Sequence, residues 1–263
     1  MTPTLPGGCS TYSCVTLPLR DTLELIRRRT RRIEILSEGL HDLFRYRDAL
    51  DGMDADFTVH APTSEMNLAG LNERMRSAGL QVIDDLCTIC DEIRAETLVV
   101  HPGFSAWDSC RDQSYEALLS SLDALAVIQA SHDVRIGVEN MGSWECCHFR
   151  RPDLIPELHG RDLGFVLDVG HAFLNGALAE FLDAPAPIHV HLHDNDRTTD
   201  GHAACGTGAI DFPLVLSRLP KDVPRIIEVR GMEEFEQSIA YLTSLDQGRP
   251  AKWISSKEKR PIE

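Results

Sequence analysis

Short runs rich in β-branched and other apolar residues alternate with longer amphipathic runs along nearly the whole chain. The short runs predict strands at residues 9–14, 32–37, 56–60, 97–101, 135–140, 164–168, 188–193 and 225–229. Between them, apolar residues recur at spacings of three and four, which predicts helices at 19–30, 41–51, 71–96, 113–132, 153–159, 172–182, 212–219 and 233–245. The chain therefore repeats a strand-then-helix unit eight times.

Repeated strand–helix units favour parallel strands joined by helical crossovers, and eight such units close into a (β/α)₈ TIM barrel. A doubly wound open sheet is the alternative, but it normally carries a glycine-rich dinucleotide loop after its first strand, and GGCSTYSC is not one. We expect one α/β domain over residues 1–246. Residues 247–263 are polar and locally basic, which predicts a mobile tail with Trp253 and Ile254 as its candidate docking residues.

Composition indicates which kinds of partner and which cellular compartment to expect. The formal net charge of -15 disfavours broad affinity for nucleic acid, although it leaves a local basic groove open. No apolar run reaches the roughly 18 residues of a membrane span, and no export signal precedes the first strand, so we expect a cytoplasmic protein with reduced cysteines. Cys87 and Cys90 have the spacing of half a zinc site, but their helical context predicts two structural thiols.

Histidines and carboxylates stand at or just beyond the ends of the predicted strands. These residues are His60, His101, Glu139, Asp168, His171, His191, Asp200, His202 and Glu228. Each alone is more often a structural residue than a ligand, but in a closed barrel they meet at the rim where such enzymes place their active sites. Imidazole and carboxylate groups are ligands for Zn²⁺, Mn²⁺ and Fe²⁺. We therefore predict a site for one to three divalent ions; His189 would pack deeper, and His193 has no assigned role.

The motifs VHAP, VHPG, ENMG, LDVGH, HLHDN, DGH, GTGAID and IIEVR follow one another in this order. In this order they resemble the xylose isomerase-like barrel superfamily, over nearly all of the chain except the tail. That superfamily includes sugar and sugar-phosphate isomerases and epimerases, and also the endonuclease IV class of abasic-site nucleases.

The isomerase and epimerase branch implies a central metal held by Glu139, Asp168, His191 and Glu228. Its two glutamates, Glu139 and Glu228, would exchange protons with carbon atoms next to a carbonyl. His171 joins them as a candidate catalytic residue. Arg197 is a further candidate, because the Asn195-Asp196-Arg197 segment resembles the epimerase pattern, which implies that Arg197 assists beside Glu139 or the substrate. Gly206, Thr207 and Gly208 are candidate substrate-binding residues whose backbone N–H groups would cradle a phosphate, the alternative being a plain loop turn.

The nuclease branch implies a three-metal site, and all nine strand-end residues match its ligands. Its members follow the first histidine with an aromatic wedge, however, and here Thr63 stands near that place. We therefore predict first a Zn²⁺- or Mn²⁺-dependent isomerase or epimerase acting on a sugar or sugar phosphate. The second prediction is a zinc-dependent abasic-site endonuclease or related phosphoesterase. A non-catalytic metal-binding barrel is the third, and the intact glutamate pair speaks against it.

Overall fold

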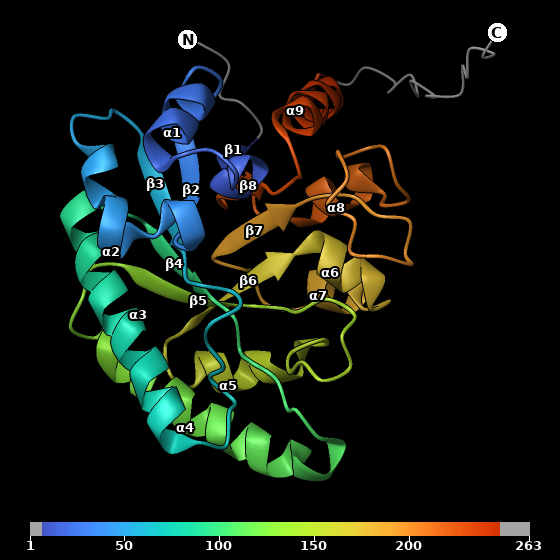
Figure 1. Cartoon of the computed structure of the whole chain (residues 1–263). Helices are drawn as coiled ribbons and strands as arrows, with labels where there is room; N and C mark the ends of the chain where they lie inside the picture. The colour runs from blue at the N-terminus through green and yellow to red at the C-terminus, as the bar shows by residue number, and fades with distance from the viewer. Residues whose placement is uncertain (1–6, 248–263) are drawn as a thin grey trace, which may run out of the picture.

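The structure is a computed structural model that describes residues 7–247. Eight parallel strands close into a barrel in sequence order (Figure 1). They are β1 (Gly8–Ser10), β2 (Arg32–Leu36), β3 (Asp56–His60), β4 (Thr97–Val100), β5 (Arg135–Glu139), β6 (Gly164–Asp168), β7 (His189–Leu192) and β8 (Arg225–Ile227). Because β1 pairs with both β2 and β8, the sheet has no edge. The predicted single-domain TIM barrel is confirmed, and the open sheet is excluded.

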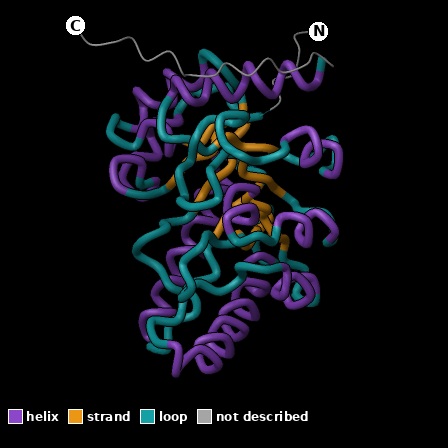
Figure 2. The backbone as a smooth tube through the Cα atoms, turned by 90° about the vertical axis from the view of Figure 1, so that its right-hand side faces the viewer, coloured by secondary structure: helices purple, strands orange, loops and turns teal. Residues whose placement is uncertain are grey.

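Helices surround the strands and cover their outer surface (Figure 2). They are α1 (Leu19–Arg27), α2 (Leu43–Tyr46), α3 (Glu73–Ile93), α4 (Arg111–Gln129), α5 (Ile155–His159), α6 (Val169–Leu174), α7 (Leu178–Asp183), α8 (Phe212–Arg218) and α9 (Met232–Asp246). Short 3₁₀ turns are η1 (Thr11–Cys14), η2 (Gly39–His41), η3 (Arg47–Leu50), η4 (Asp108–Cys110) and η5 (Pro152–Leu154). Buried apolar side chains between strands and helices form the core.

Three predicted elements differ most from the structure, in which one ends early and two are broken. The first strand ends at Ser10, whose side chain accepts a hydrogen bond from the N–H of Tyr12 and starts the 3₁₀ turn η1. The helix predicted at 41–51 is split into η2, α2 and η3, because the side chain of Asp42 caps a new helix start. The helix predicted at 172–182 breaks into α6 and α7, and Gly176 occupies a left-handed conformation there with φ of +67°.

Strand register brings the functional side chains to one rim. His60 at the end of β3 pairs with Leu36 of β2, and Asp168 at the end of β6 pairs with His191 of β7. Since all strands are parallel, their carboxyl ends share one mouth of the barrel. This mouth is where the sequence places the candidate ligands.

The cysteine pair on α3 lies outside the mouth of the barrel. Cys87 and Cys90 are free thiols buried on the core side of α3, and burial raises the pKa of Cys87 to about 12. The predicted tail and its Trp253 and Ile254 lie outside the described residues. No helix between residues 7 and 247 is long and apolar enough to cross a bilayer.

Candidate metal centre

The mouth of the barrel gathers all nine predicted strand-end residues into three groups, two of which share Glu139. Within each group, one potential ligand atom of every member lies within 4.8 Å of the others. The central group is Glu139, Asp168, His191 and Glu228, one flanking group is His60, His101 and Glu139, and the other is His171, His193, Asp200 and His202. His193 enters a group although the sequence assigned it no role. The structure therefore brings these side chains together at the mouth, as the sequence predicts.

Glu139 belongs to both the central group and the group of His60 and His101, and it contacts His191 within the central group. Oε2 of Glu139 lies 3.0 Å from Nε2 of His101 and 3.1 Å from Nε2 of His60, and its Oε1 lies 2.8 Å from Nδ1 of His191. The same Nδ1 lies 3.6 Å from Oε2 of Glu228 and 3.9 Å from Oδ2 of Asp168. Three carboxylates thus surround a single imidazole nitrogen, an arrangement in which a cation fits.

Backbone carbonyls fix the ring orientation of three histidines at the rim. The Nδ1–H groups of His60, His171 and His202 donate to the carbonyls of Ala61, Asn140 and Glu228, at 2.7, 2.9 and 2.9 Å. A histidine whose Nδ1 carries the proton presents its Nε2 lone pair as a ligand atom. The three Nε2 atoms face carboxylates, Glu139 for His60 and Asp200 for the other two.

Protons on the imidazoles offset the carboxylate charge. Burial alone would lower the pKa of His60, but Glu139 raises it to about 9. Burial likewise opposes protonation of His202, yet Asp200 and Glu228 raise its pKa to about 9. Burial alone would raise the pKa of Glu139, and His191, His101 and His60 lower it well below its ordinary value. A metal ion would take the place of such protons, since ligating imidazoles must be neutral.

Unpartnered oxygen atoms test whether these residues fit a metal. Oδ2 of Asp168 and Oδ1 of Asp200 are buried and accept no hydrogen bond. Burying a carboxylate oxygen without a partner is costly. A divalent cation at the central group would satisfy Oδ2 of Asp168, and one at the flanking group would satisfy Oδ1 of Asp200. The donors available are imidazole nitrogen and carboxylate oxygen, which suit Zn²⁺ or Mn²⁺.

Glu34 on β2 is a functional candidate that the sequence analysis missed. It is fully buried, with Oε1 2.9 Å from Nε2 of His191 and Oε2 2.9 Å from Nε2 of His189. These contacts anchor the face of His191 that points away from Glu139. Strand alternation carried the signal, because Ile33 and Ile35 face the helices and must turn Glu34 into the barrel.

The predicted phosphate cradle at Gly206, Thr207 and Gly208 is already engaged by the protein itself. The N–H groups of Gly206 and Gly208 donate to Oδ2 of buried Asp194 at 3.0 and 2.9 Å. The N–H of Thr207 donates to the carbonyl of Ala204 at 3.1 Å. These groups have no free donor for a substrate, so the segment forms a loop turn around Asp194, the alternative that the sequence left open.

Arg197 lies away from the cavity at the mouth. It is exposed on the loop after β7, and its guanidinium carbon stands 5.0 Å from the centroid of the Phe173 ring. It is not among the residues that line the cavity. The structure therefore does not bring it beside Glu139, as the epimerase pattern had suggested.

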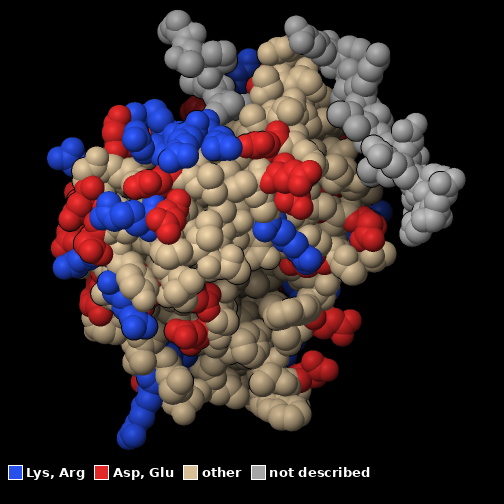
Figure 3. All heavy atoms as spheres, turned by 45° about the horizontal axis from the view of Figure 1, so that its top comes forward, with Lys and Arg blue, Asp and Glu red and all other residues tan. Residues whose placement is uncertain are grey.

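A cavity of about 580 Å³ opens above the three groups. Its wall includes the apolar and aromatic side chains of Tyr12, Met66, Phe104, Met141 and Trp144, and Trp144 is 74% exposed. None of the described residues that line it is lysine or arginine. The face in Figure 3 carries one cluster of basic side chains in its upper part, bordered by acidic ones, and acidic and basic side chains lie close together over the rest.

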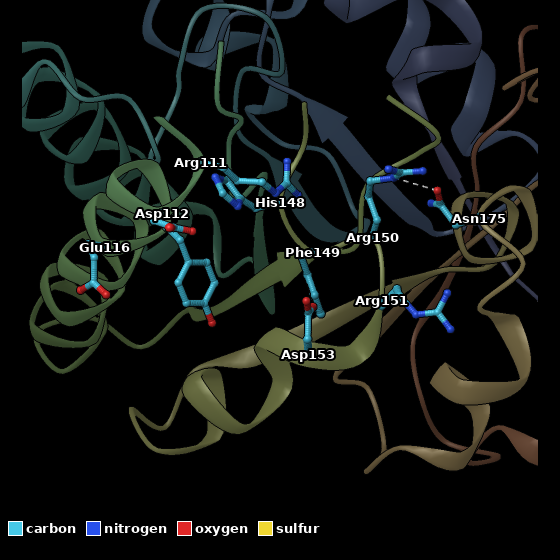
Figure 4. Close-up of a pocket in the computed structure, with 10 residues that line it drawn as sticks. Arg111, Asp112, Glu116, His148, Phe149, Arg150, Arg151, Asp153 and Asn175 are labelled. Atoms are coloured by element: carbon cyan, nitrogen blue, oxygen red, sulfur yellow. Dashed lines mark hydrogen bonds between the residues drawn. The ribbon is translucent and has the colours of Figure 1, made fainter. Parts of the chain in front are cut away.

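A second cavity of about 520 Å³ lies outside the barrel, between α4 and the segment that leads into α5 (Figure 4). Three arginines line it, and each is engaged. Arg111 donates to the carbonyls of Glu145 and Cys147, Arg150 donates to Oδ1 of Asn175, and Arg151 donates to Oε1 of Glu180. His148 completes the wall with Nε2 2.9 Å from Oγ of Ser114. The arginines of this cavity are thus bound by the protein itself.

Comparison with known proteins agrees with this geometry. The chain is 30% identical over 226 residues to an uncharacterized Methanocaldococcus jannaschii protein, MJ1614, covering 84% of this chain and 88% of that one. It is 30% identical over 208 residues to a probable endonuclease 4 of Mycobacterium tuberculosis (strain ATCC 25177 / H37Ra), covering 74% and 80%. A crystal structure of a D-tagatose 3-epimerase-like protein superimposes with a TM-score of 0.83 at 28% identity, covering 92% and 97%.

The sequence model of one family matches residues 20–245, which include every strand from β2 to β8. Its description is the xylose isomerase-like TIM barrel. The chain belongs to the xylose isomerase-like TIM barrel family.

Proposed function

We propose that the protein is a divalent-metal-dependent isomerase or epimerase of a small sugar. The central group carries this proposal, because it places two glutamates, an aspartate and a histidine within 4.8 Å of one another at the base of the cavity. Bound there, Zn²⁺ or Mn²⁺ would polarise a carbonyl oxygen and acidify the adjacent C–H bond. Glu139 or Glu228 would take that proton, and the other glutamate would return a proton to the opposite face or to the neighbouring carbon.

The cavity wall supports a small sugar without a phosphate group. Its apolar and aromatic side chains suit the C–H faces of a sugar ring, and no lysine or arginine lines it within residues 7–247 to bind a phosphate. The backbone N–H groups of Gly206 and Gly208 are also taken by Asp194. Similarity to the D-tagatose 3-epimerase-like protein adds support for an epimerase.

An abasic-site endonuclease is the second candidate, and three observations favour it. The flanking groups supply donors for further metal ions, and relatives named probable endonuclease 4 match most of the chain. Trp144 at the cavity mouth is also an exposed aromatic side chain of the kind that can enter a DNA helix. Against it, Thr63 after the first histidine is small and donates to Glu38.

Solvent exchange separates the two functions. The metal-replete protein is incubated in D₂O with a panel of ketohexoses and pentuloses, and NMR follows deuterium at the carbons next to the carbonyl. We expect exchange with wild type and its loss with Glu228→Gln, while Arg150→Ala in the outer cavity exchanges normally. Metal-dependent nicking of an abasic-site oligonucleotide, with no exchange into any sugar, would overturn the proposal in favour of the nuclease.

A further inference from the structure

His193 is a buried histidine immediately behind the central group, on the loop that leaves β7. It is fully buried, and its Nε2–H donates to Oδ1 of Asp168 at 3.1 Å. A carboxylate oxygen can only accept, so this contact places the proton on Nε2. The same Oδ1 also accepts the backbone N–H of His171 at 2.7 Å. Two donors therefore bind one oxygen of Asp168 and leave the other, Oδ2, unpartnered toward His191.

The orientation of the ring rules out His193 as a ligand beside His202. The two imidazoles stack with their centroids 4.0 Å apart and their planes only 13° from parallel. A metal ion binds an imidazole nitrogen in the plane of the ring, about 2.0–2.1 Å away for zinc. An ion within that distance of a nitrogen of both His193 and His202 would lie between the two ring planes and in neither of them. His202 has its Nδ1–H on a backbone carbonyl and its Nε2 toward Asp200, so it is the ligand of the two.

A glycine lets the ring reach Asp168. A Cβ atom on Gly170 would lie 2.1 Å from Cε1 and 2.4 Å from Nε2 of His193, which is far inside contact distance. The carbonyl of Gly170 accepts a hydrogen bond from Nδ2 of the buried Asn195 at 3.0 Å, which ties the loop after β7 to the first turn of α6. The ring therefore fills a slot closed by α6 on one side and by His202 on the other.

We propose that His193 is a positioning residue that occupies Oδ1 of Asp168 and so presents Oδ2 to the metal of the central group. The proposal rests on the metal site of the proposed function and assigns a role to a side chain outside its ligands. Partners that hold a ligand in this way typically change metal affinity by about 10–100-fold when they are removed. Gly170 is the second requirement, because any larger side chain displaces the ring.

Metal affinity, rather than turnover, tests this role. Protein freed of metal by a chelator is titrated with Zn²⁺ in competition with a chromogenic chelator, for wild type and each variant. We expect His193→Phe, which keeps the ring volume without a donor, to weaken the tightest site about 10–100-fold. We expect His193→Gln, which keeps an N–H near the same place, to restore affinity to within about threefold of wild type, since the same hydrogen bond is remade.

Two further variants keep the test decisive if His193→Phe unfolds. Gly170→Ala changes neither a ligand nor His193 itself, but its Cβ displaces the His193 ring, so we expect it to weaken zinc binding as His193→Phe does. His148→Phe, at a buried histidine of the outer cavity, is the matched control and should bind zinc as wild type does. Circular dichroism and thermal unfolding of the metal-free proteins show which variants are folded.

Three results would overturn the assignment. Unchanged affinity in both His193→Phe and Gly170→Ala removes the positioning role. The loss of one whole zinc equivalent at saturation in His193→Phe makes the residue a ligand instead. Affinity in a folded His193→Gln as low as in His193→Phe makes the contribution one of shape alone. Wild-type protein that binds no divalent ion would instead refute the proposed function itself, so the two failures are separable.

Discussion

The cavity at the barrel mouth and the cavity beside α4 differ by little in volume, about 580 against about 520 Å³, and both contain charged side chains. Beside α4, the guanidiniums bind carbonyls and an amide of the protein itself (Figure 4). At the mouth, carboxylate oxygens of Asp168 and Asp200 are buried with no hydrogen-bond donor. Unsatisfied buried groups, rather than volume or charge, therefore distinguish a place built for a ligand from a gap between elements.

Substitution of Glu139 should give the largest difference in turnover between a variant at the mouth and a variant in the outer cavity. It contacts His60, His101 and His191 and belongs to two of the three groups, so Glu139→Gln removes both a ligand and a proton acceptor. We expect the turnover of the sugar that exchanges deuterium to fall about 10²–10⁴-fold, the usual contribution of a general acid or base. Arg150→Ala, in the outer cavity, should change turnover less than about twofold, because Arg150 hydrogen-bonds to Asn175 there and does not line the cavity at the mouth. Comparable losses in both variants would abolish the distinction.

Removal of metal from the mouth should lower the melting temperature of the protein. An ion present at 100 times its dissociation constant stabilises the folded state by about 2.7 kcal/mol. For a domain of this size, each kcal/mol moves the melting temperature by about 2–4 °C, so chelation should lower it by about 5–10 °C. Calorimetric scans with and without EDTA measure the shift. Glu139→Gln is the control, since its melting temperature should respond much less to EDTA; an equal response would place the stabilising ion elsewhere.

Arg111 should show the opposite behaviour, a loss of stability without a loss of metal. Its guanidinium holds two carbonyls of the loop between β5 and α5. Replacing it by alanine leaves those carbonyls without that donor, which we expect to cost about 1–3 kcal/mol of the free energy of unfolding in urea. Zinc affinity should stay as in wild type. A weaker zinc site in Arg111→Ala would show that the two cavities are energetically coupled through this loop.

The sequence predicted what depends on strand periodicity and missed what depends on loop direction. His60, Asp168 and His191 lie at the mouth as predicted, because alternation along a strand and barrel closure fix where the residues near its carboxyl end point. Glu34 follows from the same rule and could have been found.

The course of the loops was beyond such rules. Asp194 captures the backbone N–H groups of Gly206 and Gly208 only because the chain folds back on itself, as its antiparallel bridge to Ala203 shows. Arg197 turns away from the mouth through a backbone φ of +70°, which its motif does not reveal. The break of the predicted helix at Gly176 is likewise a local backbone effect, although the glycine itself was a visible signal.

His132 offers the smallest test, of a histidine that lies at neither cavity and is paired within the protein. Its Nδ1 lies 2.8 Å from Oδ2 of Asp91 and its Nε2 lies 3.2 Å from Oδ1 of Asp84, both on α3. Burial opposes protonation, but the two aspartates raise the pKa of His132 above its ordinary value. Its stabilising contribution is therefore fully present below the unfolded pKa of about 6.5 and is lost as the pH rises through the higher folded pKa.

Urea unfolding of wild type and His132→Gln at pH 6 and pH 9 measures this contribution. We expect wild type to exceed the variant by about 0.5 kcal/mol more at pH 6 than at pH 9, the size of an ion pair near the surface. Groups at the mouth titrate in both proteins and cancel in the difference, because independent sites add. A gap that is equal at both pH values would mean that His132 is held by neutral hydrogen bonds. A gap that widens at pH 9 would mean that folding lowers the pKa of His132 instead of raising it.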